Sequence, residues 1–210
     1  FRRPGLQPKR IVSAGIIPDA TYGAAVTGIA HTDLAILQRQ AAATMAPLKR
    51  GASRTAKMLL HGDPTVGPAT AAAAHWAKEV WRTSMKDPRA INDRTLMRLW
   101  SSSSLNATRH WSQVRSPLQA ALLELHRIEW KWSHPFRYID DQGNNINLLD
   151  ISAKQVARLL IQGHKRHMER KIATDHKETG FYRISFVKIS QLLRSKKFPS
   201  DQKGILTCWS

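Results

Sequence analysis

The chain has 210 residues, of which 33 are lysine or arginine and 15 are aspartate or glutamate, so its net charge is +18 and its pI is about 10.8. A hydrophobic content of 42% can build the core of one large or two small domains. The single cysteine, Cys208, excludes a disulfide framework and a multi-cysteine zinc site. No run of about 18 apolar residues occurs, so we expect no membrane span.

Helix caps and prolines divide the first half of the chain into short elements. The segment 10–17 predicts a strand or a short helix that Pro18 ends. Thr32 and Ser53 are good N-caps for the helices that follow them. We expect four helices here, at about 32–45, 54–60, 69–85 and 95–100. The four serines 101–104 predict a polar connection after the last of these helices.

The second half contains the clearest periodicity. Ser116 and Pro117 begin a helix with one apolar stripe, which we expect to run to about Trp130 or Trp132 before Pro135. The turn composition of 140–145, flanked by extended segments, predicts a β-hairpin over about 136–149. Ser152 and Gln155 form a capping box for a long helix to about 172. Further elements are expected over 181–187 and 189–196.

These elements predict a mainly α-helical fold, a multi-helix bundle with one small β-hairpin. We expect two regions: a helical region over 1–132, and a hairpin with basic helices over 133–210. Because the chain begins at Phe1 and stops in an unfinished element, we also expect it to be a piece of a longer polypeptide.

The charge imbalance indicates a polyanionic partner. So much like charge on a compact domain repels itself, and a nucleic acid would relieve that repulsion while releasing its own counterions. An anionic membrane surface fits less well, since no long basic helix carries a wide, bulky apolar face. The basic residues cluster along the chain, as a sequence-independent phosphate surface requires. The predicted phosphate contacts are Lys49, Arg50, Arg54, Lys57, Arg94, Arg98, Lys154, Arg158, Lys165, Arg166, Lys196 and Lys197. The hypothesis requires that they gather on one side of the molecule.

The segment Tyr138-Ile-Asp-Asp141 matches the Tyr-x-Asp-Asp signature of reverse transcriptases, in which paired carboxylates hold two magnesium ions. That chemistry needs a further aspartate on an earlier apolar strand, and none is evident upstream. We therefore interpret Asp140 and Asp141 as parts of a solvated hairpin turn, and keep a residual metal-dependent nucleotidyl transferase as the remote alternative.

Other candidate chemistry is weaker. His164 and His167 could meet one ion on a helix, but Lys165 and Arg166 lie between them and disfavour a cation. Cys208 has no glycine-framed surroundings that would mark a nucleophile. The loop 62–68 lacks the Lys-Ser/Thr ending of a phosphate-binding loop. We expect no catalytic residue, no metal site and no cofactor, and we interpret most of the seven tryptophans as core residues rather than base-stacking platforms.

One resemblance adds to this interpretation. Ile16-Ile17-Pro18, then Tyr22-Gly-Ala-Ala-Val26, then a helix carrying Leu34 and Leu37 resembles the region just after the palm in LINE-like (non-LTR) retroelement reverse transcriptases. The segments 59–65 and 76–81 are similar to later parts of some such polyproteins, and the likeness covers about the first 85 residues, with a fainter one over 136–160. Ala25 departs from the family pattern, in which an acidic residue is usual at this position.

The resemblance implies that the chain is the thumb and connection of an RNA-directed DNA polymerase. It places the catalytic palm upstream of Phe1, and any ribonuclease H or zinc-knuckle module downstream of Ser210. The role so implied is to grip a template–primer duplex by its backbone. The main alternative is a stand-alone basic scaffold that binds RNA or protein. The location we expect is intracellular, and the nucleus is consistent with a nucleic-acid partner.

Overall fold

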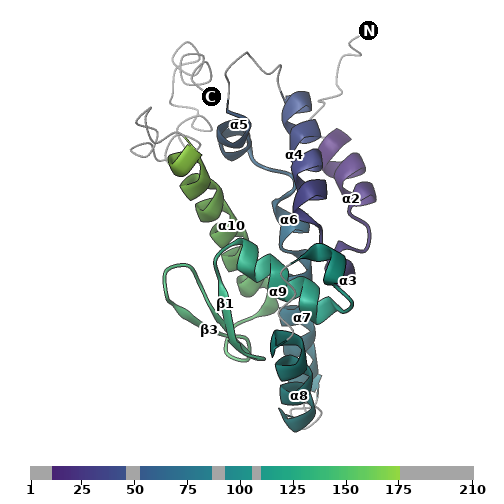
Figure 1. Cartoon of the computed structure of the whole chain (residues 1–210), viewed down its shortest axis with the longest axis vertical. Helices are drawn as coiled ribbons and strands as arrows, with labels where there is room; N and C mark the ends of the chain where they lie inside the picture. The colour runs from purple at the N-terminus through teal and green to yellow at the C-terminus, as the bar shows by residue number, and fades with distance from the viewer. Residues whose placement is uncertain (1–10, 46–52, 87–92, 106–109, 176–210) are drawn as a thin grey trace. The chain divides into compact units, whose positions relative to one another are not determined.

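The computed structural model describes residues 11–45, 53–86, 93–105 and 110–175. Contacts divide the described residues into two compact units: unit 1 comprises those within 1–20, 35–65 and 165–210, and unit 2 comprises those within 21–34 and 66–164. The helices α4 (His31–Met45) and α10 (Ala153–Asp175) each begin in unit 2 and continue without a break into unit 1 (Figure 1). The described chain is mainly helical with one small sheet, which confirms the predicted fold class.

Unit 1 is built from short helices around small apolar clusters. Besides the later parts of α4 and α10 it contains η1 (Val12–Ile16), α2 (Ile17–Ala20) and α5 (Arg54–His61). One cluster joins η1, α2, α4 and α5 through Val12, Ile17, Ala41, Ala42 and Met58. The prediction that Pro18 ends the first segment was wrong: η1 continues directly into α2, and Pro18 is the second residue of α2.

Unit 2 holds most of the helices and the whole sheet. Its elements, besides the first parts of α4 and α10, are α3 (Ala24–Thr27), α6 (Val66–Ala69), α7 (Ala71–Lys86), α8 (Asp93–Leu105), η2 (Trp111–Gln113), α9 (Pro117–Arg127), β1 (Lys131–His134), β2 (Arg137–Ile139) and β3 (Asn145–Asn147). The predicted boundary between residues 132 and 133 lies inside β1 and inside unit 2.

One core cluster connects these elements. Small side chains of α7, among them Ala73 and Ala77, let α9 pack closely against it, while Val156 and Leu160 of α10 close the same core. The rings of Trp76, Trp132 and Tyr138 meet edge to face, with centroid distances of 5.4 Å from Trp132 to each of the other two. Edge-to-face packing of this kind is a favourable arrangement of aromatic rings. The helix α7 therefore contacts both α9 and the sheet.

Gly163 of α10 allows a close approach in this core. A Cβ at this position would lie 2.6 Å from Nε1 of Trp130, so no larger residue fits without displacing the indole. The same indole nitrogen donates a hydrogen bond to Oδ1 of Asp141 over 3.1 Å. Trp130 is thus fixed between α10 and the hairpin turn.

The sheet confirms the predicted hairpin and adds a strand to it. β2 and β3 pair antiparallel with Tyr138 opposite Ile146, and β1 pairs antiparallel with the other edge of β2. The strand β1 was predicted as the end of the preceding helix, and that prediction was wrong. Buried Trp132, with exposed neighbours on both sides, shows the alternation of a strand that covers a core on one face.

The helix α9 ends at Arg127 through a Schellman motif. Glu129 has φ +64°, its N–H donates to the carbonyl of His126 over 3.1 Å, and the N–H of Trp130 donates to the carbonyl of Leu125 over 2.9 Å. Glycine is the usual residue at this left-handed position, because it has no Cβ. Glutamate there hides the signal, which is why the sequence predicted a longer helix.

The helix α8 corrects a second prediction. It continues to Leu105, through the four serines that were expected to form a polar connection. The hydroxyl of Ser102 donates to the carbonyl of Leu99 over 2.9 Å. Such a bond to the preceding turn allows serine to remain inside a helix. The elements predicted over 181–187 and 189–196 lie outside the described residues.

Candidate nucleic-acid interface

The first candidate surface is the exposed face of α10. The predicted capping box begins this helix: the N–H of Ser152 donates to Oε1 of Gln155 over 2.9 Å, and the N–H of Gln155 donates to Oγ of Ser152 over 3.3 Å. Val156 and Leu160 face the core, so the opposite side of the helix faces solvent.

Three predicted contacts lie along that solvent-facing side. Lys154, Arg158 and Lys165 are all exposed, and at 100° per residue they fall within an arc of about 40°. The rise of the helix spreads them over about 16 Å. Arg166, which is half-buried, lies beside this line. A helix that turns one side to the core and one line of cations to solvent can contact a row of phosphates.

The other predicted contacts are distributed over several elements. Arg94 and Arg98 are exposed on α8, one helical turn apart, and Arg54 is exposed at the start of α5. Lys57 is only 5% exposed, and burial lowers the pKa of its ammonium group. Its side chain does not have the solvent-facing position that the prediction assumed. The remaining four predicted contacts, Lys49, Arg50, Lys196 and Lys197, lie outside the described residues.

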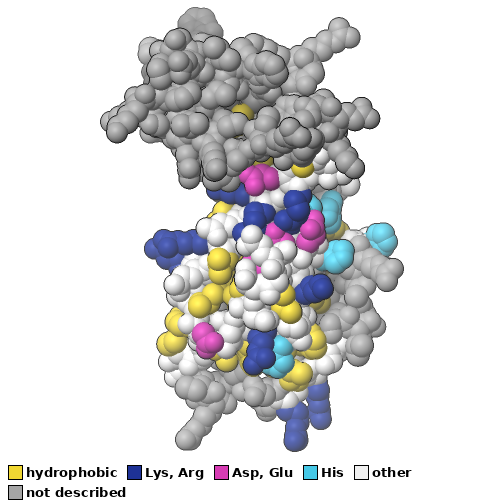
Figure 2. Space-filling view, turned by 90° about the vertical axis from the view of Figure 1, so that its left-hand side faces the viewer, with side chains coloured by type: hydrophobic (Ala, Val, Ile, Leu, Met, Phe, Trp, Pro, Cys, Tyr) yellow, Lys and Arg dark blue, Asp and Glu magenta, His cyan; other side chains and the backbone are white. Residues whose placement is uncertain are grey.

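The basic side chains do not merge on the face that Figure 2 shows. The lysine and arginine side chains visible there form several separate groups, with uncharged, histidine and acidic side chains between them. On this face of the described residues there is no continuous basic track. On this face the candidate surface is a set of separate basic helix faces.

The sequence interpretation missed one such face, on α7. Lys78, Arg82 and Lys86 are exposed and follow one another at intervals of four residues, on the side of the helix opposite Ala73 and Ala77. The four-residue spacing of these three cations is visible in the sequence. The alanines that precede them indicate only the buried side of the same helix, so the basic side was not predicted.

The aspartates of the reverse-transcriptase-like signature organise the hairpin turn. Oδ1 of Asp140 accepts hydrogen bonds from the N–H groups of Gln142 and Asn144, at 2.9 and 2.8 Å, and Oδ2 accepts from Nδ2 of Asn144 at 3.0 Å. Asp141 accepts from the indole of Trp130. Both carboxylates thus have structural partners here. Among the described residues no group of three or more histidine, cysteine, aspartate or glutamate side chains could hold a metal ion, and His164 is buried while His167 is half-buried.

Glu124 is a buried carboxylate that caps a helix from a distance. It lies on α9, and its Oε2 accepts a hydrogen bond from the N–H of Ala73 over 3.0 Å, in the first turn of α7. The hydroxyl of Tyr138 donates a hydrogen bond to the carbonyl of Ala73 over 3.2 Å. Burial raises the pKa of Glu124 to about 8, although the hydrogen bond from Ala73 and the positive charge of Arg127 oppose that rise.

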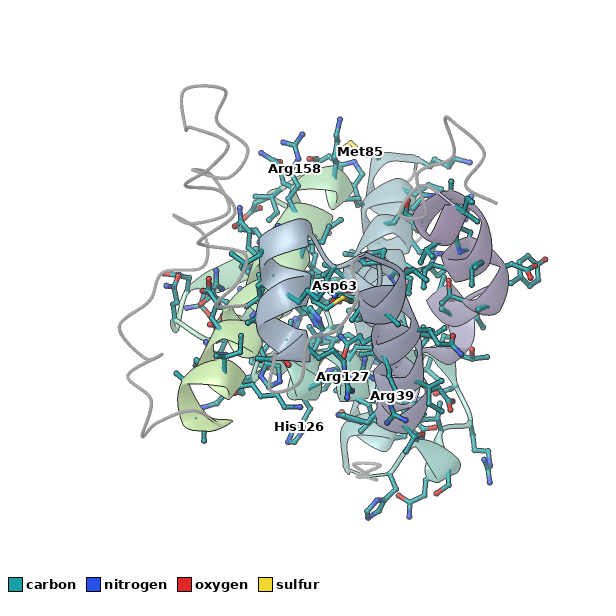
Figure 3. All side chains as sticks on the ribbon, turned by 90° about the horizontal axis from the view of Figure 1, so that it is seen from above. Arg39, Asp63, Met85, His126, Arg127 and Arg158 are labelled. Atoms are coloured by element: carbon teal, nitrogen blue, oxygen red, sulfur yellow. The ribbon has the colours of Figure 1, made fainter. Side chains whose placement is uncertain are left out.

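Arg127 is a buried cation, in contrast to the exposed ones (Figure 3). One of its terminal nitrogens, Nη2, donates to the carbonyl of Ile29, and its guanidinium carbon lies 5.1 Å from the centroid of the Trp111 ring. Burial lowers its pKa, and Glu124 partly opposes that effect. Trp111 in turn donates to Nδ1 of His31 over 2.9 Å. This arginine is part of the core and is not available to a partner.

The tryptophans of the described chain mostly serve the core, as predicted. Trp130 and Trp132 are buried, and Trp76, Trp100 and Trp111 are half-buried and packed against the main cluster. The indole of Trp76 also donates to the carbonyl of Pro135 over 3.1 Å. An aromatic side chain that is strongly exposed is Tyr22, beside the left-handed Gly23.

Comparison with known proteins returned no matching family model, no matching curated protein and no matching solved structure. In the part of the chain that the structure describes, no helix is both long and apolar enough to cross a membrane.

Proposed function

We propose that this chain is a non-catalytic nucleic-acid-binding segment that holds the backbone of a duplex through exposed basic helix faces. The observation that carries the proposal is the solvent-facing line of Lys154, Arg158 and Lys165 on α10. Contacts of this kind read no base sequence, since they reach phosphates rather than base edges. They need only cations that remain exposed when the helix packs, as these do.

The placement of acidic residues supports the same proposal. Glu124 is buried and accepts from a backbone N–H, and Asp63 accepts from the N–H and hydroxyl of Thr65, at 2.7 and 2.6 Å. Asp140 and Asp141 are held in the hairpin turn. These carboxylates are used inside the fold, so they do little to neutralise the surface cations. The cations on the surface are therefore opposed only by the other acids, such as the exposed Asp33 and Asp150.

A duplex suits the described surface better than a single strand does. Proteins that bind single strands combine a basic groove with aromatic side chains on which bases stack. Five tryptophans lie in or against the core: Trp76, Trp100, Trp111, Trp130 and Trp132. Trp81 on α7 is half-buried, and none of the basic helix faces on α7, α8 or α10 carries an exposed aromatic residue among its described side chains. Phosphate contacts without stacking are typical of duplex binding through the backbone.

The resemblance to LINE-like retroelement reverse transcriptases supports a template–primer as the duplex. Under the proposal the chain is a thumb-and-connection segment of such a polyprotein, and the duplex is its template–primer. The segment Tyr22–Val26, which carries the resemblance, forms a turn and the short helix α3. Ala25 is half-buried there, at the position where the family usually has an acidic side chain. A contact made by that acid in the family is not assigned to this chain.

Salt-dependent binding to a duplex tests the proposal. Fluorescence anisotropy with a labelled duplex of about 20 base pairs, two helical turns, should give affinities that fall steeply as salt rises. Lys154→Gln with Arg158→Gln removes two phosphate contacts, so the slope of log K against log salt should become shallower by about 1.8. The matched control is Lys131→Gln with Arg137→Gln, which removes two exposed charges from the sheet.

The control variant should bind nearly as the wild type does. If the wild type binds equally well at low and high salt, the phosphate surface is refuted. If both double variants lose affinity to the same extent, only total charge matters, and the assignment to α10 is wrong.

A further inference from the structure

A second basic line lies on α7, and sequence reasoning did not assign it to any function. Lys78, Arg82 and Lys86 project from the side of α7 that is turned away from the core alanines, within an arc of about 80° and over about 12 Å. The helix belongs to unit 2, as do Lys154 and Arg158. The α7 line and the first two residues of the α10 line are therefore carried by one compact unit, whose core packs against both helices.

Figure 3 labels Met85, which lies between Arg82 and Lys86 on α7, and Arg158 on α10. Both helices turn their buried faces toward the same cluster, so each turns its basic line to solvent.

The carboxylate of Glu79 pairs with Arg82, one of the three cations of the α7 line. Oε2 of Glu79 accepts from Nε of Arg82 over 2.9 Å and forms an ion pair with Nη2 at 2.5 Å. The pair is largely exposed, so the attraction between its partners is weak in water and a phosphate can compete for the arginine. Glu79 therefore lowers the positive potential of this face without closing it.

We propose that Lys78, Arg82 and Lys86 form a second phosphate-binding contact, which holds the backbone of a duplex as the basic line on α10 does. This inference rests on the proposed function and extends it to a second helix. An anionic membrane is the competing partner for such a face. Met85, 61% exposed, is the large apolar side chain that α7 exposes among its described residues, and one such residue does not make the wide apolar face that membrane binding needs.

A gain of binding gives the sharpest test, since misfolding cannot produce it. Glu79→Gln releases Arg82 and raises the net charge by one, so the affinity for the duplex at low salt should rise and the salt slope should steepen by about 0.9. Asp33→Asn is the matched control, because it adds the same charge on α4, where Asp33 is exposed. It should change the affinity much less.

The complementary loss of binding uses Lys78→Gln, Arg82→Gln and Lys86→Gln together. The slope should become shallower by about 2.7, and combining these changes with those on α10 should add to the effect. If the α7 variants bind as the wild type does while the α10 variant is weakened, the second contact is refuted and the proposed function survives. If neither set changes binding, the second contact and the proposed function both fail.

The same proteins should bind mixed phosphatidylcholine–phosphatidylserine vesicles more weakly than the duplex at equal salt. Tighter vesicle binding that depends on Lys78, Arg82 and Lys86 would overturn the choice of ligand.

Discussion

At the scale of single residues, Glu124 and Arg127 show how buried titratable groups are used in this chain. Both lie on α9, three residues apart, and both bond to backbone groups of neighbouring segments rather than to solvent. Burial penalises the charged form of each, which raises the pKa of the acid and lowers that of the base. Their role is to join α9 to the start of α7 and to the segment before α4, and that role depends on residues more than fifty positions away.

The pKa of Glu124 predicts a pH-dependent stability. The folded state holds this proton up to about pH 8, whereas the unfolded chain releases it near 4.5. Between these values the folded state binds more protons than the unfolded state, so the free energy of unfolding falls as the pH rises through this window. Above it, the contribution stays lost. Glu124→Gln keeps a hydrogen-bond acceptor but cannot ionise, so its stability should lack this component.

Urea unfolding of both proteins at a series of pH values measures this component. The variant should gain in stability relative to the wild type as the pH rises from about 4.5 to about 8. Taking the difference removes the contributions of the other titratable groups, which the two proteins share. A difference that stays constant with pH would show that Glu124 has an ordinary pKa in the folded state.

At the scale of elements, helix starts were easier to predict than helix ends. Ser53 and Ser116 accept hydrogen bonds from the N–H groups of Ala56 and Gln119, each over 3.3 Å, as their positions before apolar periodicity had indicated. The predicted N-cap at Thr32 was wrong, because α4 already begins at His31. Those signals are local. The end of α9 and the whole of β1 were missed because the residue that turns the chain is Glu129, whose type gives no hint of a left-handed conformation.

The left-handed conformation of Glu129 predicts a stabilising substitution. A left-handed backbone strains any residue with a Cβ, and Glu129 occupies one at φ +64°. Glu129→Gly should therefore raise the free energy of unfolding by up to about 1 kcal/mol, after the entropy of glycine in the unfolded chain is subtracted. Lys131→Gly is the control, since Lys131 is exposed and lies in an extended strand. It should lower stability by roughly 0.5–1 kcal/mol.

Denaturant midpoints and slopes decide between these outcomes. If Glu129→Gly is neutral or destabilising with an unchanged slope, the side chain of Glu129 contributes more to the fold than its backbone costs. If the two glycine variants behave alike, the left-handed position carries no particular strain.

Helical spacing was enough to predict the exposed cations of the candidate site. It could not predict which cations the packing of the fold buries. Lys154, Arg158 and Lys165 share a face that helical spacing reveals once the capping box at Ser152 sets the start of the helix. The same rule of spacing could not show that Lys57 is buried, or that Arg127 points into the core. Those two cations have ordinary sequence surroundings, and only the packing of distant elements separates them from the exposed ones.

At the scale of the whole molecule, the net charge of +18 should give the free protein and its duplex complex opposite responses to salt. The Debye length shortens from about 30 Å at 0.01 M to about 8 Å at 0.15 M, so salt screens the repulsion among the surface cations of the free protein. The same salt weakens the phosphate contacts, because the release of counterions contributes less free energy when salt is abundant.

Thermal melting of the chain with and without the duplex measures both effects. The midpoint of the free protein should rise with sodium chloride over this range, while the increase that the duplex provides should shrink. Potassium chloride should act alike, since screening depends on ionic strength and not on the identity of the cation. A free protein whose midpoint falls with salt would mean that attraction, not repulsion, dominates its surface. The surplus of lysine and arginine could not then be what prepares this chain for a polyanion.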